Sequence, residues 1–191
     1  MVQANTISIL ELPARKQLAF GLMIIDRMVP SLMAFSRETG FDTSSFFVAR
    51  EAAWRVLEGG DKNLLSQSIG DACLQSAPDT EDFSHPLTSN ALNAVVAASD
   101  VVDFILQGSP DRIANIATLA TDSIYLYLST LEDGVESLPT NGERFRSHSL
   151  MEQELRQEGE DLKFLAALPD HFDASVISVR SLVADKQDRQ T

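Results

Sequence analysis

Residues 27–47, RMVPSLMAFSRETGFDTSSFF, decide the fold, because a proline interrupts an apolar segment of helical order and a glycine ends it. Pro30 cannot continue a regular helix interior, since it removes a hydrogen bond and its ring clashes with the preceding turn, at a cost of about 3 kcal/mol. The apolar pattern nevertheless runs through it. We therefore expect the first helix to kink or end near Met28. A second helix would begin with Pro30 in its first turn and continue to about Glu38.

The end of this stretch has the residues of a corner between two helices. Gly40 stands where a left-handed residue closes a helix, and Phe41 can then fold back on Phe35 one turn inside it. Asp42 is placed to cap the next helix, with Phe41 before the cap and Phe46 inside it forming a hydrophobic staple. We expect this corner to have a structural role, with its aromatic side chains in the core, and not to form an active site.

Helical periodicity continues on both sides of the corner, and no segment alternates as a strand does. One helix face is formed by Leu18, Leu22, Ile25, Val29 and Leu32. Further helices are expected over Phe46–Leu57, about 62–76, about 88–107, from Pro110 onward, about 149–168, and after Pro169 through Phe172, Val176, Val179 and Val183. Loops are expected at 76–86 and 132–143, which are rich in Pro, Gly, Asp and Ser.

The turn "GSPD" joins two of these helices into an antiparallel hairpin. Gly108 would end one helix, Ser109 would cap the next, and Pro110 would take its first position, where a missing N–H costs nothing. These patterns predict an all-α fold, a single-domain bundle of about seven or eight helices over residues 1–191. The tail from about residue 185 is polar.

Composition is that of an ordinary globular domain, with 191 residues of which 44% are hydrophobic and 23% charged. The longest uninterrupted apolar runs are only a few residues, far short of the roughly 20 that cross a bilayer. The N-terminal residues MVQANTISILELPARKQ lack the basic start, apolar stretch and cleavage site of a secretory signal. We expect a cytoplasmic protein with no membrane span.

The net charge of -13 is concentrated in the middle of the chain, where residues 61–135 hold eleven acidic and two basic residues. An acidic surface repels phosphate backbones and anionic lipid heads. We therefore expect no binding to nucleic acid or to membranes, and we attribute the charge to solubility.

Motifs for several kinds of chemistry are missing from the sequence. The single cysteine, Cys73, excludes an internal disulfide and a multi-cysteine zinc site, and its apolar helical setting predicts packing rather than nucleophilic work. Nucleophile-elbow, Walker and dinucleotide-binding motifs do not occur. Trp54, Phe46 and Phe47 could line a small-molecule pocket, although core packing is the simpler interpretation. No cofactor is expected.

The three histidines, His85, His148 and His171, are expected in or beside loops. Asp82 and His85 have the spacing of a metal-binding pair, but further ligands of defined geometry are missing, and no Glu-x-x-His motif of di-iron bundles occurs. We interpret these residues as surface groups and expect no metal site.

The acids with the strongest pattern are Glu154, Glu158 and Asp161, which share one face of the helix at about 149–168. Glu158 falls within the apolar stripe, and a buried carboxylate can serve as a general acid or base. The structural alternative is that Glu158 meets solvent or pairs with an arginine such as Arg27 or Arg50, which we favour. Asp100, Asp103 and Asp122 are interpreted as solvated helix faces.

Three stretches together resemble a known family. They are DRMVPSLMAFSRETGF at 26–41, DFSHPLTSNALNAVVAASDVV at 82–102 and HSLMEQELRQEGEDLKFL at 148–165. Matching positions are Arg27, Met28, Pro30, Phe35, Thr39, Gly40, Phe41, Trp54, Asp82, Phe83, Ala91, Leu92, Ala94, Leu150, Met151 and Glu154. The chain resembles the YjaG-like family of bacterial proteins, also called domain of unknown function 416. It departs from that pattern at Asn93, where an aspartate is expected, and at Ser149, where a proline is expected. The resemblance implies an all-helical fold in the bacterial cytoplasm and supplies no known activity and no catalytic residues.

The leading hypothesis is a noncatalytic helical protein that acts by association, with itself as a homodimer or with another protein. The alternative is an enzyme or small-ligand binder with a carboxylate site near Glu154 and Glu158, helped by His148. An interior pocket where these side chains converge would favour the alternative, and scattered, outward-facing side chains would remove it.

Overall fold

The computed structural model describes residues 9–131 and 145–177, and in these ranges every regular element is a helix. The all-α prediction is therefore confirmed. The elements are α2 (Ala14–Thr39), α3 (Ser44–Leu57), the 3-10 helix η1 (Lys62–Leu64), α4 (Gln67–Gln75), α5 (Thr88–Gln107), α6 (Pro110–Leu131) and α8 (Ser149–Ala167). The second predicted loop and the polar tail lie outside the described residues.

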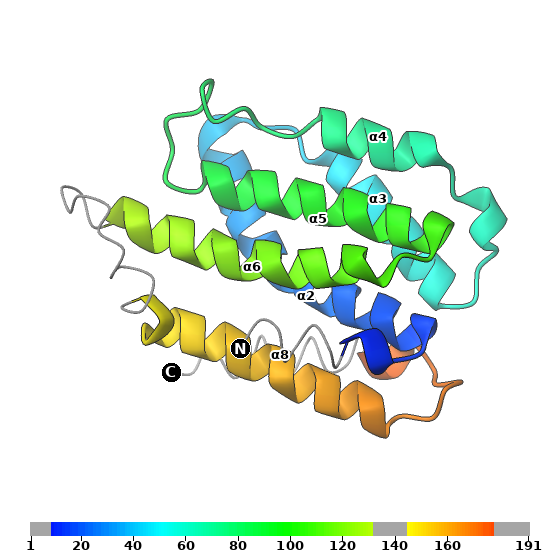
Figure 1. The fold of residues 1–191 in the computed structure, drawn as a ribbon. Helices are drawn as coiled ribbons and strands as arrows, with labels where there is room; N and C mark the ends of the chain where they lie inside the picture. The colour runs from blue at the N-terminus through cyan, green and yellow to red at the C-terminus, as the bar shows by residue number, and fades with distance from the viewer. Residues whose placement is uncertain (1–8, 132–144, 178–191) are drawn as a thin grey trace.

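Helices α2, α5 and α6 form the centre of the bundle. Figure 1 shows α5 and α6 side by side, with α2 behind them, α4 on one side and α8 on the other. Gly21 on α2 lets this helix approach α6 closely, because a Cβ at that position would lie 3.0 Å from the Cδ1 atom of Ile113. The largest fully buried side chains of the core include Phe20 and Phe35 on α2 and Phe46 on α3.

The helix end predicted near Met28 is wrong, because α2 runs from Ala14 to Thr39 with Pro30 inside it, whereas a kink within α2 stays a prediction. Pro30 is exposed, whereas Met28 and Leu32 on either side of it are buried. The proline therefore faces water, which can hydrate the carbonyl that loses its intrahelical partner. Burial of the neighbouring apolar side chains offsets the local cost, so no second helix begins at Pro30.

The corner after α2 is built as predicted at Gly40 and Phe41, but the N-cap of α3 is Thr43 and not Asp42. Gly40 has a φ of 76° and its N–H donates to the Ser36 carbonyl over 2.8 Å. The Phe41 ring lies 5.5 Å from the Phe35 ring, centroid to centroid. Asp42 Oδ1 accepts from the Ser44 N–H over 2.9 Å at the start of α3. Contact between Phe41 and Phe46 stays a prediction.

The hairpin of α5 and α6 also agrees with the sequence prediction. Gly108 is left-handed with a φ of 74°, and Pro110 is the first residue of α6. The helix predicted over 62–76 is instead divided into η1 and α4, because Leu65 and Ser66 between them are extended. The loop predicted at 76–86 lies between α4 and α5.

The beginning of α2 is joined to the segment that follows α8. Lys16 is buried, and its Nζ donates to the Leu168 carbonyl over 2.6 Å and pairs with Asp170 over 3.3 Å. Arg15 donates to the Phe172 carbonyl over 3.2 Å and lies 4.9 Å above the centre of the Phe172 ring. The helix predicted after Pro169 has only its beginning within the described residues, where Phe172 is buried.

Two described helices, α2 and α5, are long and apolar enough to cross a membrane by length and composition alone. Their most apolar windows are 61% and 67% buried inside the fold, and the central helix of a bundle passes the same test. The absence of a membrane span stays a prediction.

Candidate functional site

Arg27 on α2 gathers the three acidic residues of α8 that the sequence singled out. Its Nη2 lies 2.7 Å from Glu154 Oε1, and its Nη1 lies 2.7 Å from Asp161 Oδ2. The Nε of Arg27 adds contacts of 3.2 Å to both carboxylate oxygens of Glu154. One guanidinium therefore holds α2 against α8 through two carboxylates.

The carboxylates around Arg27 shift the pKa of its guanidinium. Burial by itself would lower the pKa of Arg27, but the charges of Glu154, Asp161 and Glu158 outweigh it and raise that pKa above its ordinary value. Asp161 is fully buried and also accepts from Gln157 Nε2 over 2.9 Å. Glu158 is 2% exposed, so it does not meet solvent. We name Arg27, Glu154, Glu158 and Asp161 the Arg27 cluster.

The predicted carboxylates are thus brought together around an arginine, but the ion pairs with Arg27 are formed by Glu154 and Asp161, whereas the structural alternative names Glu158. Glu154 and Asp161 serve as ion-pair partners of Arg27 and join two helices. The other arginine named as a partner, Arg50, pairs with Asp26 on α2 over 2.6 Å instead. This arrangement supports a fixed ion-pair network better than a proton-transfer site.

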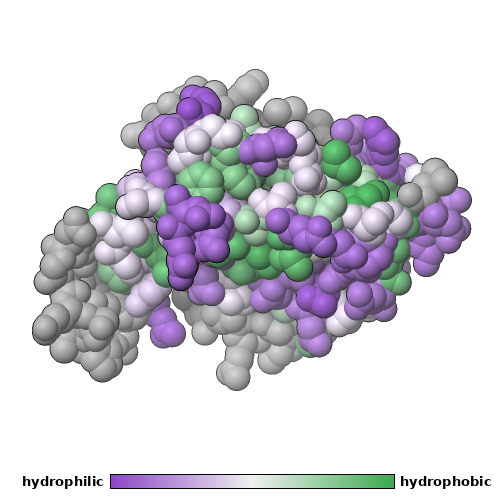
Figure 2. Space-filling model, turned by 90° about the horizontal axis from the view of Figure 1, so that it is seen from above, coloured by the Kyte–Doolittle hydropathy of each residue, from purple (hydrophilic) through white to green (hydrophobic). Residues whose placement is uncertain are grey.

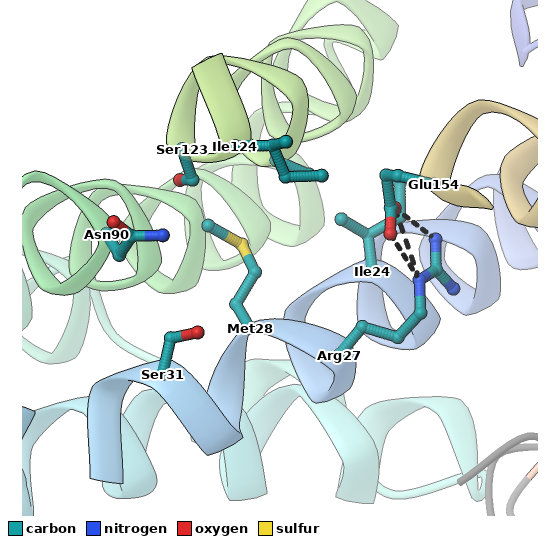
Figure 3. Close-up of a pocket in the computed structure, with 9 residues that line it drawn as sticks. Ile24, Arg27, Met28, Ser31, Asn90, Ser123, Ile124 and Glu154 are labelled. Atoms are coloured by element: carbon teal, nitrogen blue, oxygen red, sulfur yellow. Dashed lines mark hydrogen bonds and ion pairs between the residues drawn. The ribbon is translucent and has the colours of Figure 1, made fainter. Parts of the chain in front are cut away.

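A pocket with a cavity volume of about 90 Å³ lies beside the Arg27 cluster, between α2, α5, α6 and α8. Figure 3 shows the Arg27–Glu154 ion pair at one side of it and Asn90 at the other. The lining is completed by Ile24, Met28, Ser31, Ala120, Ser123 and Ile124. Its volume is well below the roughly 300–1,000 Å³ of a drug-sized ligand site. The pocket suits only a small group or a few waters.

Sequence reasoning missed Asn90, which is 8% exposed and reaches the pocket from the first turn of α5. Its Oδ1 is buried and has no hydrogen-bond partner within residues 9–131 and 145–177. A lone asparagine in an apolar helix carries no motif, so the sequence held no signal for this role.

The histidines lie outside the pocket. His148 is the N-cap of α8, where its Nδ1 accepts from the Leu150 N–H over 3.2 Å, so it does not assist the Arg27 cluster. His85 accepts the Leu87 N–H at Nδ1, and its Nε2 lies 2.8 Å from Glu38 Oε2. His171 is exposed.

Metal-ligating side chains do not cluster in the part of the chain that the structure describes. No group of three or more His, Cys, Asp or Glu residues there could hold a metal ion. Asp82 and His85 therefore have no third side chain beside them, among the described residues, that would complete a metal site.

Cys73 and the aromatic residues of α3 lie in the core. Burial raises the pKa of the Cys73 thiol to about 12, and its Sγ lies 3.5 Å from the Val95 carbonyl. A thiol with this pKa is a poor nucleophile at neutral pH. Phe46 and Trp54 belong to the hydrophobic core, and neither they nor Phe47 line the pocket.

The interpretation of Asp100 as part of a solvated face of the α5–α6 hairpin is wrong. It is 4% exposed, and it accepts from Arg112 Nη1 over 2.8 Å and from Asn115 Nδ2 over 2.6 Å. Burial raises its pKa, against the opposing effect of these two partners. Asp103 is likewise paired, 3.2 Å from Arg112 Nη2, whereas Asp122 is exposed. Helix spacing alone did not reveal that Arg112 covers this position.

Comparisons with known proteins agree with the resemblance. The model of a family described as "Protein of unknown function (DUF416)" matches residues 6–188. A solved structure, the crystal structure of a DUF416 family protein from Shewanella baltica OS155, superposes with a TM-score of 0.80 at 19% sequence identity. The match covers 94% of this chain and 93% of that chain, which shows a shared fold. No curated protein matches the chain.

Proposed function

We propose, on the premise that this chain belongs to the DUF416 family of proteins of unknown function, that it is a noncatalytic helical protein of the bacterial cytoplasm that acts by association. Its first partner would be a second copy of the chain, and another protein is the alternative partner. The bacterial part of the proposal is supported by the origin of the solved relative, Shewanella baltica. A single buried free thiol fits a reducing compartment.

The noncatalytic part rests on what the reactive side chains do. Glu154 and Asp161 are held by Arg27, His148 caps a helix, and the Cys73 thiol is buried with a raised pKa. A general acid or base needs access to its substrate and a pKa near the working pH. These residues serve packing, pairing and capping instead.

The observation that carries association is a set of exposed large apolar side chains at one end of the molecule. Figure 1 places the C-terminal end of α6 beside the N-terminal end of α8. Leu131 is 60% exposed at the end of α6, and Leu150 is 41% exposed in the first turn of α8. Tyr125 and Leu126 on α6 are each 38% exposed. Burial of such side chains against a partner is favourable by about 25 cal/mol per Å².

The charge of the chain sets the conditions under which copies would associate. Two copies with a net charge of -13 each repel one another, so apolar contact must provide the attraction. The face on the side of α4, seen from above, mixes hydrophilic and hydrophobic residues (Figure 2). We therefore expect association to strengthen as salt screens the repulsion, and we expect no affinity for nucleic acid or anionic lipid.

Sedimentation velocity over a range of protein concentrations, at low and at high salt, tests the proposal. We expect a dimer whose share increases with salt and decreases in Leu131→Lys. A matched control is Val48→Lys, since Val48 is 55% exposed on α3, away from this end. A strictly monomeric protein at all salt concentrations, together with pull-downs that recover no partner, would end the proposal.

A further inference from the structure

Asn90 has the surroundings of a ligand-binding residue. Its side chain is more than nine-tenths buried, and its Oδ1 has no hydrogen-bond partner among the described residues. A buried polar atom without a partner destabilises the fold unless something else supplies the missing hydrogen bond. In Figure 3 the amide nitrogen of Asn90 points across the pocket toward Met28, and Oδ1 points in another direction.

The pocket offers room for only a small group. Its volume of about 90 Å³ compares with roughly 30 Å³ per water molecule in the liquid. The side chains of Ile24, Met28 and Ile124 provide an apolar wall, and the Ser31 hydroxyl adds a polar group. Because the pocket is partly open to solvent, a longer molecule could place one end in it.

The charges around the pocket favour an uncharged group. Arg27 and Glu154 both line it, and they neutralise one another at 2.7 Å. The charges of Asp161 and Glu158 also act on this guanidinium, so it has little positive charge left to attract an anion. A cation, in turn, would lie against the Arg27 guanidinium. The pocket therefore favours neither an anion nor a cation.

We propose that this pocket binds an uncharged carboxamide group at the end of a small molecule, with Asn90 as its main binding residue. A carboxamide both donates and accepts, so it can accept from the Asn90 amide N–H that reaches the pocket and donate to the Ser31 hydroxyl oxygen at once. If the two amide atoms of Asn90 exchange places, its oxygen accepts from the carboxamide N–H and the Ser31 hydroxyl donates to the carboxamide oxygen. The aliphatic part of the ligand then lies against Ile24 and Ile124. This inference goes beyond association and does not depend on it.

Three small molecules of matched size distinguish the charge classes, namely propionamide, propylammonium and propionate. Each is titrated into the isotope-labelled protein while amide chemical shifts are followed by NMR. We expect propionamide to shift resonances on α2, α5 and α6 around the pocket, with weak millimolar affinity because so few heavy atoms can contribute. Propionate is expected to leave those resonances unchanged, and propylammonium to bind at least threefold more weakly than propionamide.

Variants test the role of Asn90. Asn90→Leu should weaken propionamide binding at least tenfold and also raise the melting temperature, because it removes the buried polar atom that lacks a partner. Ser31→Ala should weaken binding a few-fold, and it provides a second test should Asn90→Leu fold poorly. The control Asn63→Leu changes an exposed asparagine on η1 and should bind as the unchanged protein does.

Several outcomes overturn the proposal. The absence of any saturable shift at the pocket means that only water occupies it. Unchanged propionamide binding in Asn90→Leu and Ser31→Ala means that the molecule binds elsewhere. Tighter binding of propionate or propylammonium means that the pocket selects a charged group.

Discussion

Removal of the Arg27 side-chain charge is the most informative perturbation of this fold. In Arg27→Met, a side chain of similar length keeps the packing of α2 but removes the guanidinium charge from the carboxylates of α8. Asp161 is 0% exposed as a side chain and Glu154 is 13% exposed, so water can replace little of the lost interaction. We expect a strongly destabilised but folded protein.

The magnitude follows from the burial of the cluster. Breaking a buried ion pair by removing one partner costs about 3–5 kcal/mol. The Arg27 side chain is itself 24% exposed, so we take the lower end, about 3 kcal/mol. For a chain of 191 residues, 1 kcal/mol corresponds to about 2–4 °C in melting temperature. The expected decrease is therefore roughly 6–12 °C.

The direction in which pH changes the stability of the variant can also be predicted. The variant lacks the positive charge that favours the ionised carboxylates in the folded state, so its folded state takes up protons more readily than that of the unchanged protein. The loss of stability caused by the substitution then diminishes as the pH falls from neutral toward about 5. In the unchanged protein the pKa of Arg27 is raised, so the stabilisation from its charge is lost only when the pH rises toward that high pKa, beyond the assay range.

Urea unfolding followed by circular dichroism at several pH values measures both effects. Arg55→Met is the control, because Arg55 and Glu51 form a pair in which both side chains are more than 60% exposed, and it should cost less than about 1 kcal/mol. A loss below about 1 kcal/mol in Arg27→Met, or a loss that does not diminish at lower pH, would refute the view that these carboxylates depend on Arg27.

Further predictions concern two glycines and the cysteine. Gly40→Ala should destabilise the protein by about 1 kcal/mol, because φ is 76° there, whereas Gly159→Ala, in the middle of α8 with open space around it, should stabilise it by about 0.5–1 kcal/mol. Thermal melts of the two variants check this, and equal shifts in one direction would contradict it. Cys73, with its pKa raised to about 12, should resist a thiol reagent in the folded protein at pH 7 and react once urea unfolds the chain. Rapid reaction without denaturant would mean that α4 opens readily.

Local signals predicted most of the helices. Gly108 and Pro110 mark the turn between α5 and α6, and Gly40 marks the end of α2, since these residues act through their own backbone. Pro30 misled the prediction because its effect depends on which side of the helix faces water. That side is set by packing against distant helices.

The site was predicted only in part, for a related reason. The spacing of Glu154, Glu158 and Asp161 on one helix face was visible in the sequence. Their common partner Arg27 lies more than a hundred residues away, at separations of 127 and 134. The pocket at Asn90 is lined by four helices, and Asp100 on α5 is paired with Arg112 and Asn115 of α6, and no single-helix pattern records either arrangement.

The contacts of Lys16 with the segment after α8 bear on how the chain acquires its structure during synthesis. Lys16 and the Leu168 carbonyl are separated by 152 residues, so α2 leaves the ribosome long before its acceptor exists. Pairing over such a separation is slow, because a long loop must close before the contact is gained. A nascent chain that stops short of residue 168 would keep this ammonium group in water and leave the end of α2 uncovered. Docking of α8 is therefore expected to be the late event that completes the bundle.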